Sequence, residues 1–379
     1  MIKLRNANYL QFLSETEDKR IICFGAGGTL SDFFLCNQGK IELLERVDFI
    51  LDNNPAKKGE IIYFNLKKIP VISLSDLIKS DTLLIKYVII LTLANEHIPD
   101  VVSQLDNLSM LDDMHCYIGM TAMQWGKEIY PPQQAAILTP SIKYTIPKNI
   151  HYCWFGNSPM GDMELECIDS WKKYCSDYEI TRWDESNYDI TNKPHYVRQA
   201  YDAGKYAFVS DYARLDIICN YGGIYLDTDV ELLKNLKNLL HYKAFFGFES
   251  LNLVNTGLGF GSIPGNLVLK NLMGLYRKIA FRFNDGALNI TSCPEYHTEY
   301  FRKQGLFITN RMQLFDDMIF LPSDYFCPFN QRSTLYEFTY NTTSNHRFNI
   351  SWVDDEIREN RYNEIKQNED INVRLQADW

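Results

Sequence analysis

The stretch GGIYLDTDVE at positions 222–231 contains two carboxylates, Asp227 and Asp229, that are separated by a single residue. If this stretch is a strand, both side chains point to one side of it while Thr228 points to the other. Paired carboxylate oxygens suit Mg²⁺ or Mn²⁺, cations that also bind the oxygens of a diphosphate. An exposed turn is the alternative, because Asp-x-Asp also arises by chance. The spacing makes a divalent-cation site the first hypothesis.

The residues before this pair predict the elements that would position it. The stretch from Tyr196 to the glycine pair at 222–223 is mostly helical in character, and the glycines suit a helix C-cap. Asp211 and Arg214 lie three residues apart on this helix and therefore on one face. A carboxylate pair at the end of the following strand would lie where open α/β sheets bind nucleotides. Strand, helix and strand patterns precede the helix at 149–157, 163–175 and 178–184.

Composition limits the class of protein. The chain has 379 residues, enough for two domains that each bury a core. Its net charge of −10 and its lack of a basic cluster argue against a nucleic-acid partner. The nine scattered cysteines contain no Cys-x-x-Cys pair, which indicates buried thiols in a reducing compartment. No signal peptide is evident, and no apolar run approaches the roughly 20 residues of a membrane span. We expect a cytoplasmic protein, compatible with peripheral contact at the inner membrane face.

Residues 18–120 alternate strand and helix patterns, which predicts a parallel α/β unit. FGAGGTL contains Gly25 and Gly27 but has Leu30 where the dinucleotide fingerprint has its third glycine, and Asp52 follows the second strand at the spacing of a ribose-binding acid. The unit resembles Rossmann-type modules of some sugar-modifying enzymes. Either Gly25, Gly27 and Asp52 form a nucleotide site, or the glycine turn serves packing alone.

Domain boundaries follow from local composition. TLSDFFLCN (29–37) predicts a helix capped by Thr29 or Ser31. Four prolines between 127 and 148 indicate a linker. The expected organisation is a Rossmann-like domain at 1–135, a linker at 136–147, a second α/β domain at 148–353 and a charged extension at 354–379.

A family resemblance begins at YAFVSDYARLDIICNYGGIYLDTDVELL (206–233). This stretch resembles the DXD region of bacterial glycosyltransferases of the capsular-polysaccharide type, glycosyltransferase family 32, which includes yeast mannosyltransferases of the outer-chain-initiating kind. It is more distantly similar to the glucosylating domains of large clostridial toxins. Further blocks match in the same order: IPKNIHYCWFGNSPM, CIDSWKKYCSDYEITRWDESNYDI, NTGLGFG and ISW. Together they cover about 146–352, and the first 135 residues lie outside them.

The resemblance implies a GT-A fold, an α/β sheet that binds a nucleotide sugar. Asp211 and Arg214 would grip the sugar hydroxyls and the region between sugar and phosphate. Asp227 would reach the ribose and the metal, and Asp229 the metal and the diphosphate. Further donor contacts are implied for Trp154, which would stack on uracil, and for Ser210, Tyr225 and Asn255.

The C-terminal block departs from the family pattern. Family members usually carry a His-His pair ahead of Ser-Trp, whereas this chain has His346 followed by Arg347. His346 is the expected third metal ligand, unless the ligand belongs at the second position and Arg347 instead neutralises the diphosphate. Ser351 and Trp352 match the segment that closes over the phosphates.

The carboxylate pair and the family resemblance together predict a metal-dependent glycosyltransferase using Mn²⁺ or Mg²⁺, and the resemblance implies retention of anomeric configuration. The expected donor is a UDP-linked sugar, and the expected acceptor is a polysaccharide or glycolipid intermediate. A front-face transfer is as compatible as a covalent intermediate. Three alternatives stay open: a nucleotide-sugar sensor without turnover, a toxin-like protein glucosyltransferase, and a redox function of the N-terminal unit with NAD bound through Asp52.

Overall fold

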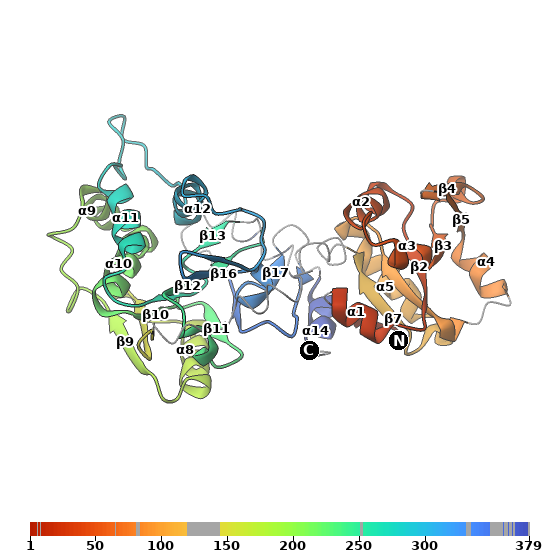
Figure 1. The fold of residues 1–379 in the computed structure, drawn as a ribbon, viewed down its shortest axis with the longest axis horizontal. Helices are drawn as coiled ribbons and strands as arrows, with labels where there is room; N and C mark the ends of the chain where they lie inside the picture. The colour runs from red at the N-terminus through yellow and green to blue at the C-terminus, as the bar shows by residue number, and fades with distance from the viewer. Residues whose placement is uncertain are drawn as a thin grey trace. The chain divides into compact units, whose positions relative to one another are not determined.

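The computed structural model describes residues 1–119 except 6, 8, 65 and 81–83, residues 145–348 except 251–252 and 331–334, residues 359, 363 and 366, and residues 368–377. The chain divides into two compact units (Figure 1). The first comprises Met1–Tyr130, Ser333–Tyr340 and Tyr362–Trp379, and the second comprises Pro131–Arg332 and Asn341–Arg361. Two C-terminal segments therefore group with the first unit, a grouping that the predicted boundaries did not include.

The first unit is built on a seven-stranded sheet in the order β1-β7-β6-β2-β3-β5-β4. All neighbouring strands are parallel except β4, which is antiparallel to β5. The strands are β1 (Lys3–Arg5), β2 (Arg20–Phe24), β3 (Val47–Leu51), β4 (Ile61–Phe64), β5 (Lys67–Ile72), β6 (Tyr87–Leu91) and β7 (His115–Ile118). The helices between them are α1 (Tyr9–Glu15), α2 (Gly28–Cys36), α3 (Ile41–Glu45), α4 (Leu74–Lys79) and α5 (Ile98–Asp106), with 3-10 turns at Pro55–Lys57, Leu84–Lys86, Asn95–His97 and Ser109–Leu111.

The central strands form where apolar runs are longest. RIICF and YVIIL are buried at four of their five positions, as expected for strands covered on both faces. The start of α2 differs from prediction: Gly27 is the N-cap, and Thr29 and Ser31 lie inside the helix. The chain turns tightly after β2, so the helix begins before either hydroxyl reaches a capping position.

The C-terminal helix α14 (Glu369–Ala377) packs on the first unit. Ile371 and Leu375 join its buried core, together with Leu335 on β18 (Leu335–Tyr336). Arg374 donates to the Asp106 carboxylate at 2.7 Å. The charged C-terminal stretch therefore contains an amphipathic helix whose apolar side is buried.

The second unit contains an eight-stranded mixed sheet, with β15-β16-β12-β14-β10-β8-β9 in order and β13 paired to β12. The β9, β8 and β10 strands are parallel, whereas β14 is antiparallel to its neighbours β10 and β12. Its strands are β8 (Asn149–Cys153), β9 (Glu179–Trp183), β10 (Gly223–Tyr225), β12 (Ala244–Phe248), β13 (Val254–Asn255), β14 (Phe260–Ser262), β15 (Gln313–Phe315) and β16 (Met318–Leu321). Outside it lie β11 (Val230–Leu232), which pairs with β19 (Ser344–His346), and β17 (Phe329–Asn330).

The helices of the second unit include the long buried helix that carries Asp211 and Arg214. The predicted helical stretch is two helices, because Gly204 adopts a positive φ of 67° and turns the chain between them. The helices are α8 (Asp162–Tyr174), α9 (His195–Asp202), α10 (Tyr206–Tyr221), α11 (Leu267–Tyr276) and α12 (Cys293–Lys303), with 3-10 turns at Lys237–Leu239 and Ser323–Tyr325. Helix α10 packs against β8, β10 and α11.

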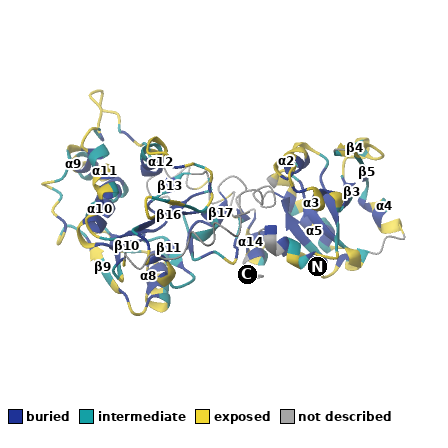
Figure 2. Cartoon of the chain, in the orientation of Figure 1, coloured by how far each residue is buried: buried dark blue, intermediate teal, exposed yellow. Residues whose placement is uncertain are grey.

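Figure 2 shows buried residues along the central strands of each unit and exposed residues on the outer faces of its helices. The apolar side chains of each unit thus enclose separate cores. Among the described residues, no helix has the length and apolar character required to cross a membrane. Each unit combines helices with a sheet rich in parallel strands, in agreement with the predicted α/β class.

Candidate active site

Arg214 is the central cation of the site. It lies on α10, one turn after Asp211, and its Nη2 atom is 3.1 Å from Asp211 Oδ1 and 3.2 Å from Asp227 Oδ1. Its Nε–H donates to the Ser210 carbonyl at 3.1 Å, which fixes the guanidinium against its own helix. The predicted helix face therefore holds an ion pair that is buried and extends to the first carboxylate of the DXD motif.

Tyr225 completes the surroundings of that carboxylate. Its hydroxyl donates to Asp227 Oδ1 at 2.9 Å, and the Arg214 guanidinium lies 5.0 Å from the centre of its ring. Because β10 ends at Tyr225, the two aspartates follow the strand in the connection to β11. The prediction of one continuous strand through both aspartates is wrong, since a turn begins after Asp227 and its carbonyl accepts from Val230 N–H at 3.0 Å.

The turn still brings Asp227 and Asp229 to one place, where they meet His346. One ligand atom from each of the three side chains lies within 4.8 Å of the other two. His346 arrives through pairing of β19 with β11, in which it lies opposite Val230, and its Nε2 is 3.4 Å from Asp229 Oδ1. Carboxylate and imidazole groups are both common ligands of divalent cations in proteins. These residues therefore fit a divalent cation.

Glycine at 257 leaves space for the carboxylates. A Cβ atom at this position would overlap Asp227 Oδ2, and it would also crowd Arg214 and Asn255. The Gly257 carbonyl accepts from Asp227 N–H at 3.2 Å, and its own N–H donates to Asn255 Oδ1 at 2.7 Å. Asn255 in turn donates to the buried Glu249 at 2.9 Å. The loop at NTGLGFG thus lies directly against the DXD segment.

Burial sets the electrostatics of the site. It raises the pKa of Asp211 to about 6, although the positive charge of Arg214 opposes this shift. Burial also raises the pKa of Asp227, and the nearby charge of Asp229 adds to the effect. More carboxylates than cations therefore face one another at low dielectric, an arrangement that a bound divalent cation would relieve.

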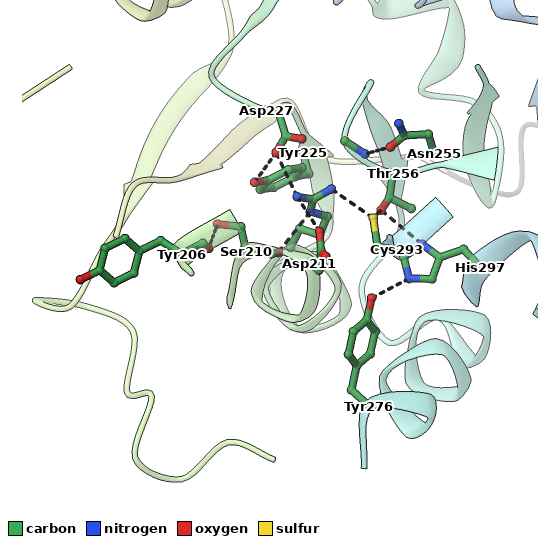
Figure 3. A network of polar contacts seen from close by, with 12 residues as sticks. Tyr206, Ser210, Asp211, Tyr225, Asp227, Asn255, Thr256, Tyr276, Cys293 and His297 are labelled. Atoms are coloured by element: carbon green, nitrogen blue, oxygen red, sulfur yellow. Dashed lines mark hydrogen bonds and ion pairs between the residues drawn. The ribbon is translucent and has the colours of Figure 1, made fainter. Parts of the chain in front are cut away.

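A second layer of polar side chains lies next to Arg214, and Figure 3 labels its members Thr256, Tyr276, Cys293 and His297. Cys293 Sγ, at the start of α12, lies 3.8 Å from Arg214 Nη1 and 3.9 Å from the Thr256 hydroxyl. His297 on the next turn contacts the Thr256 hydroxyl at 3.4 Å and the Tyr276 hydroxyl at 3.2 Å. This layer could not be predicted from the sequence, because nothing in the spacing of α11 and α12 points to α10.

Other predicted donor residues lie as follows. Trp154 comes directly after β8, is partly exposed, and donates from Nε1 to the Ser158 carbonyl at 2.7 Å. The Ser210 hydroxyl donates to the Tyr206 carbonyl at 3.1 Å, within its own helix. Asn255 lies beside the site, as described above. Ser351 and Trp352 lie outside the described residues.

The Arg347 side chain forms ion pairs with residues outside the metal-ligand group. Its guanidinium is 2.7 Å from Glu166 and 3.0 Å from Glu231, while its backbone N–H donates to the Asp229 carbonyl at 2.8 Å. The two neighbours at 346 and 347 thus have different surroundings: the imidazole faces the carboxylates of the DXD motif, and the guanidinium forms ion pairs with two glutamates.

The residues of the predicted N-terminal nucleotide site lie in the other unit. Gly25, Gly27 and Asp52 line one cavity there.

Comparison with known proteins locates the family match in the second unit. Residues 161–246 match the glycosyltransferase sugar-binding region containing the DXD motif. Inositol phosphoceramide mannosyltransferase 3 of Schizosaccharomyces pombe is 33% identical over 168 residues, which are 42% of this chain and 43% of that protein. The chain thus spans less than half the length of this curated relative.

Two solved glycosyltransferases are also similar at low level. The PaToxG glycosyltransferase is 18% identical, with a TM-score of 0.36, over 45% of this chain and 75% of that chain. A glycosyltransferase involved in glycosylation of the major capsid of PBCV-1 is 12% identical, with a TM-score of 0.30, over 57% of this chain and 98% of that chain. Scores this low do not establish a shared fold.

The sequence matches establish that the chain carries a glycosyltransferase DXD region. The matched segment contains Asp211, Arg214, Asp227 and Asp229, whereas His346 and the layer next to Arg214 lie beyond it.

Proposed function

We propose that the second unit transfers a sugar from a nucleotide-sugar donor to a glycan or lipid-linked acceptor, with a divalent cation at Asp227, Asp229 and His346. The observation that carries this proposal is the meeting of these three side chains beside an arginine that already contacts Asp227. The matched DXD region supports a nucleotide-sugar ligand, and the oxygen and nitrogen donors of the three side chains support a divalent cation. We also propose that the unit has the GT-A arrangement implied by the family resemblance.

The chemistry follows from where charge develops. Breaking the bond between sugar and diphosphate places negative charge on the leaving group and positive character on the sugar. The bound cation would supply Lewis-acid stabilisation of the diphosphate. Arg214 offers its guanidinium to the same charge, and Asp211 orients it through the contact at 3.1 Å. The Tyr225 hydroxyl donates to Asp227 Oδ1 and so positions this carboxylate for contact with the donor.

The donor and acceptor are the finer part of the proposal. The family resemblance favours a UDP-linked donor, a polysaccharide or glycolipid acceptor and retention of configuration. The relative in S. pombe is named as a mannosyltransferase of inositol phosphoceramide. A mannose donor and a lipid-linked acceptor therefore belong in the first set to be tested.

The alternative of a sensor without turnover rests on Arg347, which stands where the family usually has a second histidine that could be a metal ligand. The imidazole of His346 lies beside Asp229, and Arg347 is engaged with Glu166 and Glu231. The substitution at 347 therefore gives little reason to expect loss of metal binding, which favours the enzyme over the sensor.

The deciding experiment is nucleoside-diphosphate release from a panel of UDP-sugars and GDP-mannose, with Mn²⁺ or with chelator. Asp229→Asn tests the site, and Asp169→Asn, at an exposed position on α8, is the matched control. We expect slow Mn²⁺-dependent release from one donor, retained in the control and lost in Asp229→Asn. Release that persists in Asp229→Asn or in chelator would contradict the metal site. Binding of donors without release, with acceptors also supplied, would favour the sensor.

A further inference from the structure

The first unit contains a cavity of about 430 Å³ at the carboxyl ends of its parallel strands. Its walls come from the segments after β2, β3 and β6 and from the starts of α2 and α5. The chain passes from β2 to β3 on one side and later returns to place β6 on the other side of β2. Strand order therefore reverses at β2, and open α/β sheets bind ligands outside the strand ends at such a point. The volume lies within the range of small-molecule sites.

Gly27 and Gly28 leave part of this wall uncovered, whereas Gly25 does not. Gly25 is required by the fold, since its φ is +112° and a Cβ there would collide with the Thr92 carbonyl. Gly27 is different, because its extended φ of −100° is open to any residue and a Cβ there meets nothing within 4 Å. The same open space surrounds Gly28. Neither packing nor conformation within the unit explains these two glycines, whereas close approach of a ligand to the backbone would.

The carboxylate predicted to bind ribose has another role. Asp52 accepts from Ala26 N–H and Asn54 N–H, both at 2.8 Å, so its two oxygens hold the loops that follow β2 and β3. Asp52 therefore does not present the free carboxylate that an NAD-type site would use, and the structure weighs against the redox alternative. Its third contact, at 3.2 Å, positions Lys57.

Lys57 brings a cation to the cavity wall. Its Nζ donates to the Ala26 carbonyl at 3.0 Å and lies next to the turn that leads into α2. Among the described residues, the N–H groups of Gly28 and Thr29 have no acceptor. An ammonium group and free amides around uncovered glycines suit a phosphate group. The cavity is larger than phosphate alone requires, and Asp100 and His97 line it with further polar groups.

We propose that this cavity binds a ribonucleoside diphosphate, with a phosphate group at Gly27, Gly28 and Lys57. This site shares no residue with the proposed transferase site, so the proposal does not depend on the proposed transferase function. Its ligand is recognised by phosphate oxygens at the glycine turn and by ribose hydroxyls at the remaining polar groups of the wall.

The test is binding of ADP, GDP, CDP and UDP to the full chain by equilibrium dialysis in chelator, with no divalent cation present. Gly27→Val fills the open space with a side chain suited to extended backbone. Gly39→Val is the matched control, because a Cβ at Gly39 also meets nothing within 4 Å. We expect Gly27→Val to weaken binding of at least one nucleotide by about ten-fold or more, with Gly39→Val and Asp229→Asn close to wild type.

Lys57→Met provides the second variant. Removing the cation should weaken the same nucleotide and reduce the dependence of its affinity on salt, a readout that a loss of folding would not give. Three outcomes would overturn the proposal: no nucleotide bound at millimolar concentration, equal affinity in Gly27→Val and wild type, or affinity lost in Asp229→Asn and kept in Gly27→Val. The last would assign the binding to the transferase unit.

Discussion

His346 Nε2 lies 3.4 Å from Asp229 Oδ1, although the two residues are far apart in the chain. Pairing of β19 with β11 creates this contact, because it sets His346 opposite Val230, the residue after Asp229. The third side chain of the proposed metal site is thus supplied by a two-stranded sheet outside the main sheet of the unit.

Replacing this imidazole should weaken metal binding. We expect His346→Ala to raise the dissociation constant for Mn²⁺ by about ten-fold or more, because one of three protein ligands is lost. Mn²⁺ binding measured by electron paramagnetic resonance checks this without reference to turnover. His241→Ala, at an exposed histidine, is the control. Equal Mn²⁺ affinity in His346→Ala and wild type would remove His346 from the site.

Sequence spacing could predict the local parts of this site and not its long-range parts. The Asp211 and Arg214 pair lies on one helix, and Asp227 and Asp229 are two residues apart, so both follow from local geometry. His346 could be proposed only through the family resemblance, because strand pairing over such a separation leaves no periodic signal.

The layer next to Arg214 could not be predicted at all. Cys293 and His297 lie on one face of α12, a pattern that indicates only a buried helix side. Their role depends on how α12 packs near α10, which is tertiary structure. The same limit applied at Thr29 and Ser31, where a tight turn after β2 overrode the local capping preference.

Gly257 is a glycine whose replacement would disturb the carboxylates directly. A Cβ in Gly257→Ala would overlap Asp227 Oδ2, so the carboxylate must move away from its position beside Arg214. We expect Mn²⁺ affinity to fall by about ten-fold or more, with the fold retained. Calorimetric titration with Mn²⁺ measures the effect.

Gly274→Ala, in α11, is the matched control for this change, because a Cβ there meets nothing within 4 Å. It should leave Mn²⁺ affinity unchanged and stabilise the helix by about 0.5–1 kcal/mol. If both glycine variants bind Mn²⁺ as the wild type does, Mn²⁺ binding does not depend on the observed position of Asp227.

Two substitutions of Arg214 should distinguish its effect on stability from its effect on catalysis. Arg214→Met leaves the buried Asp211 and the half-buried Asp227 without their cation, and we expect a loss of about 3–5 kcal/mol in the free energy of unfolding. Arg214→Lys keeps the charge but cannot reproduce the planar guanidinium contacts, so we expect donor turnover to fall by about 100-fold or more in a folded protein. Chemical denaturation and nucleoside-diphosphate release measure the two effects. Arg198→Met, at an exposed position on α9, should change neither.

His297 should make stability fall in mild acid. Burial lowers its pKa to about 3, and the charge of Arg214 contributes in the same direction, whereas the ordinary value is 6.5. The folded state therefore resists a proton that the unfolded state takes up. The stabilising contribution is present above pH 6.5 and is lost as the pH falls toward 3.

From about pH 7.5 to about pH 5.5, we expect wild type to lose about 1.4 kcal/mol more stability than His297→Gln. Urea denaturation at the two pH values measures the difference. His241→Gln, which alters an exposed histidine, should keep the wild-type pH dependence. Parallel pH profiles for His297→Gln and wild type would contradict a neutral buried imidazole.

The family resemblance implies that Trp154 stacks on the base, so this residue should contribute to binding of the nucleotide and not of the sugar. The indole follows β8 at the strand end and is anchored by its donation to Ser158 at 2.7 Å, which leaves a partly exposed ring. Base stacking on an aromatic ring contributes about 1–3 kcal/mol, so Trp154→Ala should weaken UDP and every UDP-sugar by the same factor, from about five-fold to about 150-fold. Trp154→Phe should restore much of this affinity, because it keeps a ring at the position. Competition binding with UDP and two UDP-sugars measures the factors, and a loss confined to one sugar would place Trp154 at the sugar instead of the base.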